Sequence, residues 1–361
     1  MIDRCILHIG TEKTGTTSIQ EFLHLNRRAL ASQGIHVPVR LGRPEHIALA
    51  HAVLDEDKRF SRRNGPHGPG RTGAGRMRAR AARLITAELA RARATGARTV
   101  ILSSERLGAL IDRPEEMARL RALLSPLFQR VDIVVYLRPQ PDFATSYYST
   151  DLRNGSLRRS VLPDLARSPR HAQRLDYATR LEFWAQHWPE AQLSPRLFTP
   201  DALPRGDVLA DFFARADIDI TGMPRPPRQN GTLGARAQLF LRRLNWRCAK
   251  DPAFARRIDR AAILRNLEQG TTGPGRKPSR AAARAFLARF AEGNERIRAR
   301  WFPERRTLFV APLRDYPPRA TALRLTTAEF RRMLARLSPP PSPLRRAIRT
   351  ALRWVTRFQI R

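Results

Sequence analysis

Apolar runs and amphipathic segments alternate along the first half of the chain. Three short runs are mostly apolar, as in strands buried on both faces, and a fourth, weaker strand begins at Arg196. The three runs lie at residues 5–9, 99–103 and 131–137. Apolar residues at helical spacing fill the stretches between them, at residues 21–33, 45–54, 77–94 and 114–128. This alternation predicts a three-layer α/β fold with a central parallel sheet.

The rest of the chain is predicted to be mainly helical. Arginine-rich segments with helical spacing follow Thr221, at residues 233–245, 252–266 and 279–302. We therefore predict one domain over residues 1–310, with a helical C-terminal part, and an extension over residues 311–338. Residues 59–76 are rich in Gly, Pro and Arg, which predicts a flexible basic loop. That loop either covers an anionic ligand or is a solvated insertion.

The last residues, 339–361, are predicted to form a Pro-rich spacer followed by a basic amphipathic tail. Leu344, Ile348, Leu352 and Val355 recur at helical spacing, and arginines occupy the positions between them. A helix of this kind suits adsorption to an anionic membrane surface. Packing of the same apolar stripe on protein is the alternative.

The most informative segment, residues 5–23, has the pattern of a strand, a tight turn and a helix. Gly10 and Gly15 bracket the turn, which also contains Lys13, one of only four lysines in the chain. Hydroxyl side chains crowd the turn and the start of the helix, at Thr11, Thr14, Thr16, Thr17 and Ser18. Such a turn directs backbone N–H groups and a helix N-terminus at an anion, and the lysine adds a charge. The segment therefore predicts a phosphate-binding loop.

The order of residues differs from that of common nucleotide-binding loops. In the Walker A motif, G-x-x-x-x-G-K-[ST], the lysine directly follows the second glycine. Here Lys13 precedes Gly15 by two residues. A P-loop kinase or other NTPase remains an alternative, although the strand at residues 131–137 ends in an arginine and offers no Walker B aspartate.

A second motif follows that strand. Arg138 ends the strand, Pro139 and Pro141 suit the turn and the first helical position, and Ser146 falls about two turns into the next helix. Guanidinium offers permanently charged, bidentate donors to a phosphate, and a serine hydroxyl adds a neutral donor. The alternative is that Arg138 pairs with a carboxylate and Ser146 is solvated.

Together, the two motifs resemble those of the sulfotransferase family that uses 3′-phosphoadenosine 5′-phosphosulfate (PAPS), in particular its bacterial, carbohydrate-type members. The resemblance covers residues 1 to about 310 and implies a P-loop-like fold. It implies that residues Gly10, Thr11, Lys13, Thr14, Gly15, Thr16, Thr17 and Ser18 bind the 5′-phosphosulfate. It also implies that Arg138 and Ser146 hold the 3′-phosphate. PAP would be the product, and the acceptor a hydroxyl of a carbohydrate or glycolipid.

Transfer to a hydroxyl requires a base, while Lys13 would support the leaving phosphate. Glu105 is the first candidate, since it follows the strand at residues 99–103, where a carboxylate faces the ligand edge of a parallel sheet. His46 is the second candidate and His51 the third, because other members of the family use histidine. Each has an ordinary structural alternative: Glu105 favours the dipole of the helix that it begins, and the histidines are polar helix residues. Glu12 is a further carboxylate, beside Lys13.

The formal net charge of +35 changes the list of partners. A surface this basic attracts polyanions, among them nucleic acid, an anionic membrane or an anionic glycan. The chain has no zinc-finger spacing and no aromatic RNA-binding strand, so nucleic acid is not favoured. A non-catalytic basic protein that binds polyanions is the remaining alternative to an enzyme.

Metals, disulfides and membrane spans are not expected. The two cysteines, Cys5 and Cys248, form neither a disulfide framework nor a metal site. No apolar run reaches the roughly 18 residues of a membrane-spanning helix. The first strand begins too early for a signal peptide. We therefore expect a cytoplasmic protein, which the basic tail would place at the inner face of the membrane.

Overall fold

The computed structural model describes residues 1–59, 71–227, 233–270 and 273–338. The predicted tail at 339–361 and residues 60–70 of the predicted loop lie outside the described residues. The chain divides into two compact units. The first comprises Met1–Phe143, Asp164–Gln229 and Ala282–Asp315, and the second Ala144–Pro163, Asn230–Ala281 and Tyr316–Arg361. The predicted division at residues 310 and 338 stays a prediction.

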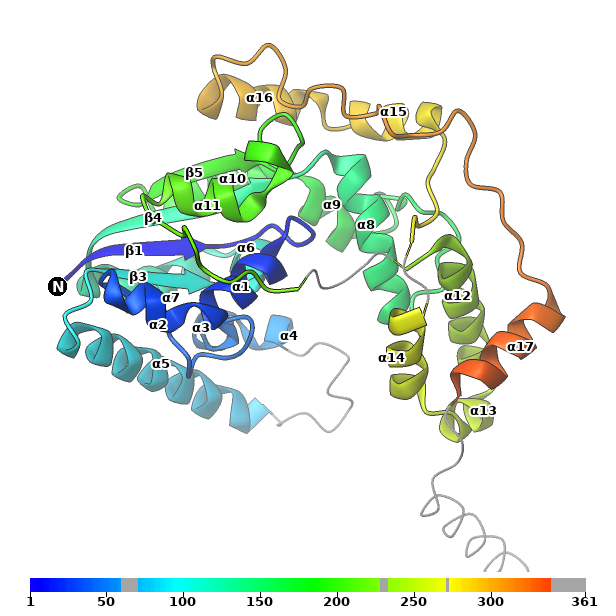
Figure 1. Ribbon diagram of the computed structural model, residues 1–361, viewed down its shortest axis with the longest axis horizontal. Coiled ribbons are helices and arrows are strands. Elements are labelled where there is room, and N and C mark those ends of the chain that lie inside the picture. The colour runs from blue at the N-terminus through cyan, green and yellow to red at the C-terminus, as the bar shows by residue number, and fades with distance from the viewer. Residues whose placement is uncertain (60–70, 228–232, 271–272, 339–361) are drawn as a thin grey trace, which may run out of the picture. The chain divides into compact units, whose positions relative to one another are not determined.

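The first unit is built on a five-stranded sheet (Figure 1). Its strands are β1 (Ile2–His8), β2 (Ile35–His36), β3 (Thr99–Ser103), β4 (Phe128–Leu137) and β5 (Gln192–Leu197). They lie in the order β2-β3-β1-β4-β5, and each neighbouring pair is parallel. Central strand β1 therefore ends between β3 and β4, so the chain segments that follow these three strands share one edge of the sheet.

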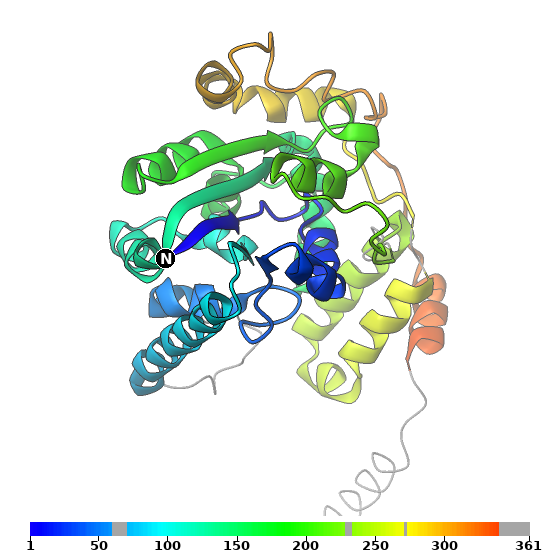
Figure 2. The ribbon, with the colours of Figure 1, turned by 60° about the vertical axis from the view of Figure 1, so that its left-hand side comes forward.

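Helices cover both faces of this sheet (Figure 2). Those within the first unit are α1 (Thr16–Leu25), α2 (Arg27–Ser32), α3 (Ile47–Val53), α4 (Glu56–Arg59), α5 (Arg71–Ala94), α6 (Glu105–Leu110), α7 (Pro114–Leu124), α9 (Pro169–Leu175), α10 (Tyr177–His187), α11 (Val208–Arg215) and α16 (Ala291–Trp301). Two short 3-10 helices lie at Ser125–Leu127, after α7, and at Pro204–Gly206, before α11. The predicted three-layer α/β fold with a central parallel sheet is confirmed.

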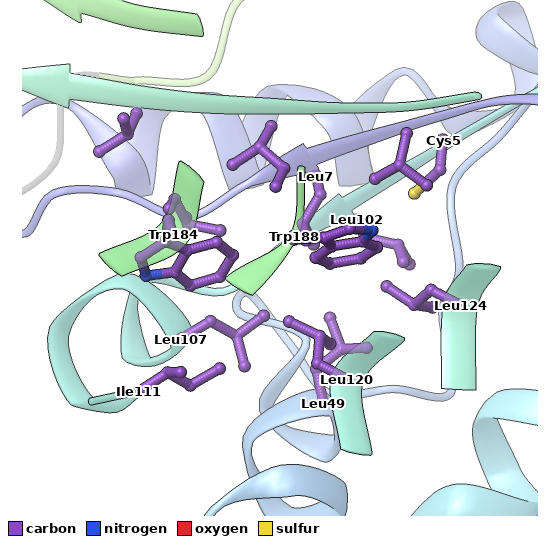
Figure 3. Packing of buried hydrophobic residues seen from close by; sticks show 14 of the residues in the cluster. Cys5, Leu7, Leu49, Leu102, Leu107, Ile111, Leu120, Leu124, Trp184 and Trp188 are labelled. Carbon is purple, nitrogen blue, oxygen red and sulfur yellow. The ribbon is translucent and has the colours of Figure 1, made fainter. Parts of the chain in front are cut away.

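Alternation along β1 directs successive side chains to opposite layers. Leu7 packs in a core with residues of α3, α5, α6, α7, α10 and α16, whereas Ile6 packs with α1, α2 and α11. Figure 3 shows part of the first core, where the side chains of Trp184 and Trp188 lie among leucines of β1, β3, α3, α6 and α7. Both faces of the sheet are thus buried, as the apolar runs predicted.

The predicted boundaries differ from the structure at several places in the first unit, and two of these differences have a clear physical cause. Residues 71–76, predicted as part of the flexible loop, belong to α5. Glycine lowers helix stability only by about 1 kcal/mol relative to alanine, so two glycines do not stop a helix of 24 residues.

The helix predicted over residues 21–33 is two helices. Asn26 separates them, and its side chain donates to the carbonyls of Phe22 and Pro224, at 3.1 and 2.9 Å.

The second unit is helical, as predicted for the C-terminal part. It contains α12 (Ala235–Lys250), α13 (Pro252–Arg257), α14 (Arg260–Gly270) and α17 (Thr327–Leu337). Two further helices, α8 (Gln140–Arg153) and α15 (Arg280–Ala288), each belong in part to both units. The second unit has its own core, in which Phe240, Leu244 and Phe330 are buried.

Candidate active site

The predicted phosphate loop connects β1 to α1 and is fixed by hydrogen bonds to β4. The N–H of Thr11 donates to the Tyr136 carbonyl at 3.1 Å, and its hydroxyl donates to the same oxygen at 2.8 Å. The hydroxyl of Thr14 donates to the Thr11 carbonyl at 2.6 Å. Both threonines are buried. Their side chains therefore stabilise the conformation of the loop. A sequence pattern cannot distinguish this structural role from ligand binding.

The backbone of the loop suits an oxyanion. Gly10 and Gly15 have φ of 96° and 79°, and Lys13 adopts 66°, so the chain turns three times through the left-handed region. Gly15 is the N-cap of α1, and within the described residues no side chain caps this helix. The first-turn N–H groups of Thr16, Thr17 and Ser18 thus remain for a ligand, at the positive end of the helix dipole. This geometry suits an oxyanion ligand, and the predicted 5′-phosphosulfate stays a prediction.

Arg138 contacts the loop directly. Its guanidinium donates from Nη1 to the Lys13 carbonyl at 3.0 Å and lies 5.7 Å from the centre of the Phe198 ring. The Arg138 carbonyl accepts from the hydroxyl of Tyr177 at 2.9 Å. The strand-end arginine is therefore placed beside the lysine, with the N-terminus of α10 anchored to it.

Ser146 lies in α8, in the part of that helix that belongs to the second unit. Arg138 belongs to the first unit. The pairing of these two residues around one phosphate therefore stays a prediction.

Glu105, the first candidate base, is joined to the loop. Its Oε2 accepts from the Thr16 hydroxyl at 2.5 Å. A side chain at Gly10 would meet the Glu105 Cβ at 3.2 Å, which shows how closely the two segments approach. Burial raises the pKa of Glu105 to about 7; the Thr16 hydrogen bond opposes this shift, and the carboxylates of Glu12 and Glu45 add to it. A carboxyl group with this pKa can exchange a proton near neutral pH.

Glu45 fixes the segment that carries Glu105. Its Oε1 accepts from the Ser104 hydroxyl at 2.7 Å and from the Arg106 N–H at 3.3 Å. Its Oε2 accepts from Arg106 Nε at 3.0 Å. Glu45 therefore caps α6 from outside the helix and holds its first turn against the loop.

His46, the second candidate base, occupies a structural position. It is the N-cap of α3 and is buried. Its Nδ1 accepts from the Ser103 N–H at 3.1 Å, and its ring also bonds to the Pro38 backbone. Burial lowers the pKa of His46 to about 4, so the ring is neutral at pH 7. These contacts tie α3 to β3, and they occupy the ring that a base would need. His51, the third candidate, lies in the last turn of α3.

The position of α6 depends on Gly108. An added Cβ there would lie 2.2 Å from the Ile9 carbonyl, closer than any real contact. We expect Gly108→Ala to lower the free energy of unfolding by about 1–3 kcal/mol, as overpacking does. Urea unfolding measures this. Gly75→Ala in α5 is the control: its Cβ would meet nothing within 4 Å, so it should not destabilise the protein. Equal stability of the Gly108 variant would show that α6 is not packed this closely.

Two arginines near the loop were not among the predicted site residues. Arg174 of α9 donates from Nε to Glu12 Oε2 at 2.9 Å. Arg180 of α10 is half-buried nearby. Burial lowers its pKa; Glu12 opposes this shift and Arg174 adds to it. Because arginine is so frequent in this chain, an arginine at these two positions does not indicate a functional residue. Only the folded structure shows that both lie near the loop.

Over the described residues, no cluster of three or more histidine, cysteine, aspartate or glutamate side chains is arranged to bind a metal ion. In the same residues, no helix combines the length and apolar character needed to span a bilayer.

Comparisons with known proteins yield distant structural similarity only. No family model and no curated protein matches the chain. One similar solved structure is a sulfotransferase from Alicyclobacillus acidocaldarius, with 19% identity and a TM-score of 0.40, covering 72% of this chain and 94% of that one. Another is the sulfotransferase domain of the Synechococcus PCC 7002 olefin synthase, with 13% identity and a TM-score of 0.36, covering 80% and 95%.

Proposed function

We propose that this protein is a sulfotransferase that moves a sulfuryl group from PAPS to a hydroxyl of a carbohydrate or glycolipid. The observation that carries the proposal is the hydrogen bond between Thr16 and Glu105. Glu105 carries a carboxyl group with a pKa of about 7, and Thr16 is the first residue of α1. This helix directly follows the loop that contains Lys13, and no side chain in the described part of the chain caps it. A base and an anion-binding loop are the two parts that sulfuryl transfer to a hydroxyl needs.

In this reaction, the residues of the chain position the reactants and move one proton. PAPS supplies the sulfuryl group and a phosphate leaving group. The acceptor oxygen forms a bond to sulfur, the bond between sulfur and the bridging phosphate oxygen breaks, and that oxygen keeps the electron pair. Glu105 takes the hydroxyl proton, and Lys13 with the first N–H groups of α1 stabilises the charge that develops on the phosphate. Arg138 donates to the Lys13 carbonyl and therefore adds a positive charge next to the loop.

The donor is tested by two nucleotides that differ only in the 3′-phosphate. We expect PAP to bind more tightly than AMP, because Arg138 and Ser146 are assigned to that phosphate. Hydrogen bonds to charged groups contribute about 1.5–3 kcal/mol each, which corresponds to one to two decades of affinity. Isothermal titration calorimetry at physiological salt measures both.

Variants and competing ligands complete this test. Arg138→Gln should remove most of the difference between PAP and AMP, while Arg167→Gln, at a side chain that is 89% exposed, should leave it unchanged. Equal binding of the two nucleotides by the unmodified protein would contradict the assignment. Preferential binding of ATP would favour an NTPase instead, and preferential binding of duplex DNA a non-catalytic polyanion-binding protein.

A further inference from the structure

Two arginines face the phosphate loop from the helices that follow α8. Arg174 lies in α9 and Arg180 in the second turn of α10. Tyr177 anchors α10, because its hydroxyl donates to the Arg138 carbonyl at the end of β4. Since residues three apart lie on one side of a helix, Arg180 is on the side of α10 that Tyr177 directs at this strand end. The two guanidinium groups therefore lie near Glu12 and the loop.

Arg174 forms an ion pair with a carboxylate. Its Nε donates to Glu12 Oε2 at 2.9 Å, and both side chains are less than one-fifth exposed, at 18% and 19%. Glu12 directly precedes Lys13 in the loop. This ion pair, 162 residues apart in sequence, links the loop to α9.

Arg180 has no such counter-charge. Its Nη2 donates to the Gln173 carbonyl at 2.7 Å, and among the described residues no carboxylate lies within ion-pair distance of its guanidinium. Burial lowers the pKa of Arg180, which Tyr177 and Glu12 oppose. A half-buried guanidinium with only a carbonyl partner leaves most of its five N–H donors for a ligand. Planar oxyanions are the ligands that match such a group.

The arginines share a face of the sheet with the candidate base. Tyr177 and Leu181 of α10 pack in the same core as Leu107 of α6, the helix that begins at Glu105. Glu12 connects the two places, since its carboxylate raises the pKa of Glu105 and also pairs with Arg174. Arg138, in contrast, lies over Phe198, which packs against the opposite core. An anion at Arg174 and Arg180 would therefore belong to the molecule that Glu105 deprotonates.

We propose that Arg174 and Arg180 form an oxyanion-binding site for the acceptor, so that the molecule modified by this protein carries a carboxylate or a sulfate close to the reacting hydroxyl. The identification of the bound molecule as the acceptor rests on the proposed function, but the anion site itself does not. Glu12 acts as the competitor that holds Arg174 before the acceptor binds. Its removal should therefore strengthen anion binding, whereas removal of Arg180 should weaken it.

Binding of three related sugars tests the site. Glucuronate and glucose 6-sulfate carry the two candidate anions, and glucose carries none. On PAP-saturated protein, we expect calorimetric competition to show both anionic sugars binding at least about ten-fold more tightly than glucose, the value of one charge-assisted hydrogen bond. The ratio of the two anionic affinities tells carboxylate from sulfate recognition.

Variants assign this preference to the arginine pair. Arg180→Gln should lower both anionic affinities to that of glucose, and Arg180→Lys should recover part of the preference. Glu12→Gln should raise the anionic affinities, because Arg174 is released. Arg170→Gln, at an exposed position of the same helix as Arg174, is the control and should change nothing. Thermal unfolding of each variant confirms that the fold is retained.

Three results would overturn the inference. The first is an unchanged preference in folded Arg180→Gln protein. The second is equal binding of anionic and neutral sugars by the unmodified protein. The third is a loss of PAP affinity in Arg180→Gln, which would assign the guanidinium to the donor. If PAP itself fails to bind, the proposed function fails, and the same titrations on unloaded protein still test the anion site.

Discussion

Lys13→Ala is expected to lower the rate of sulfate transfer by at least about two to three orders of magnitude, as removal of one donor to a developing oxyanion does. Lys13 lies in the loop between β1 and α1, with its carbonyl bonded to Arg138 and its backbone in the left-handed region. The side chain is half-buried at the surface of the unit and does not belong to either core. Transfer of radiolabelled sulfate from PAPS measures the effect.

Two further variants show that the effect comes from the ammonium group of Lys13. Lys13→Arg should restore only a small part of the rate, because a planar guanidinium does not replace a compact ammonium in a tight loop. Lys250→Ala removes an exposed lysine at the end of α12, in the second unit, and should leave the rate unchanged. A Lys13→Ala protein with nearly normal turnover would show that the ammonium group of Lys13 takes no part in transfer.

The arrangement of the site's segments could be predicted because the sheet is parallel. Apolar runs located β1, β3 and β4 to within a few residues, and parallel strands end at a common edge. Gly10, Glu105 and Arg138 follow these three strands. That they lie together therefore follows from strand order, without any knowledge of individual contacts.

Individual contacts could not be predicted in the same way. His46 has the residue type of a base, yet two backbone groups hold its ring. Thr11 and Thr14 have the residue type of phosphate ligands, yet their hydroxyls bond to loop and strand carbonyls. Periodicity gives the face of a helix but not which of several polar groups wins a given hydrogen bond. Arg174 and Glu12 are 162 residues apart, so no local pattern connects them.

Glu105→Gln is expected to abolish transfer, while PAP should bind almost as tightly as before. A base acts on the acceptor hydroxyl, so its loss does not remove a contact to the donor. His46→Ala is the paired variant: we expect it to destabilise the protein, because the bond to the Ser103 N–H is lost, but to retain the shape of the pH profile. An inactive, folded His46→Ala protein beside an active Glu105→Gln protein would reverse the assignment of the base.

The pH dependence of transfer gives a second test of Glu105. Its pKa is about 7, and the carboxylate is the basic form, so the rate should rise as pH increases through 7. Thr16→Val removes a hydrogen bond that lowers this pKa, and should move the rise to higher pH. Glu45→Gln removes a carboxylate that raises it, and should move the rise to lower pH while an amide oxygen still accepts from Ser104. Shifts in the same direction would exclude Glu105 as the titrating group.

Protein stability reports the same ionisation without any substrate. The pKa of Glu105 is about 7 in the folded protein and near its ordinary value of 4.5 in the unfolded chain. The folded state therefore binds the proton more tightly, and Glu105 costs stability increasingly as pH rises from 4.5 to 7. Glu105→Gln is neutral at every pH, so its stability relative to the unmodified protein should increase over this interval and level off above pH 7. Urea unfolding from pH 4 to pH 8 measures the difference. A difference that does not change with pH would show that the carboxyl group of Glu105 titrates normally, and would contradict the raised pKa on which its assignment as the base rests.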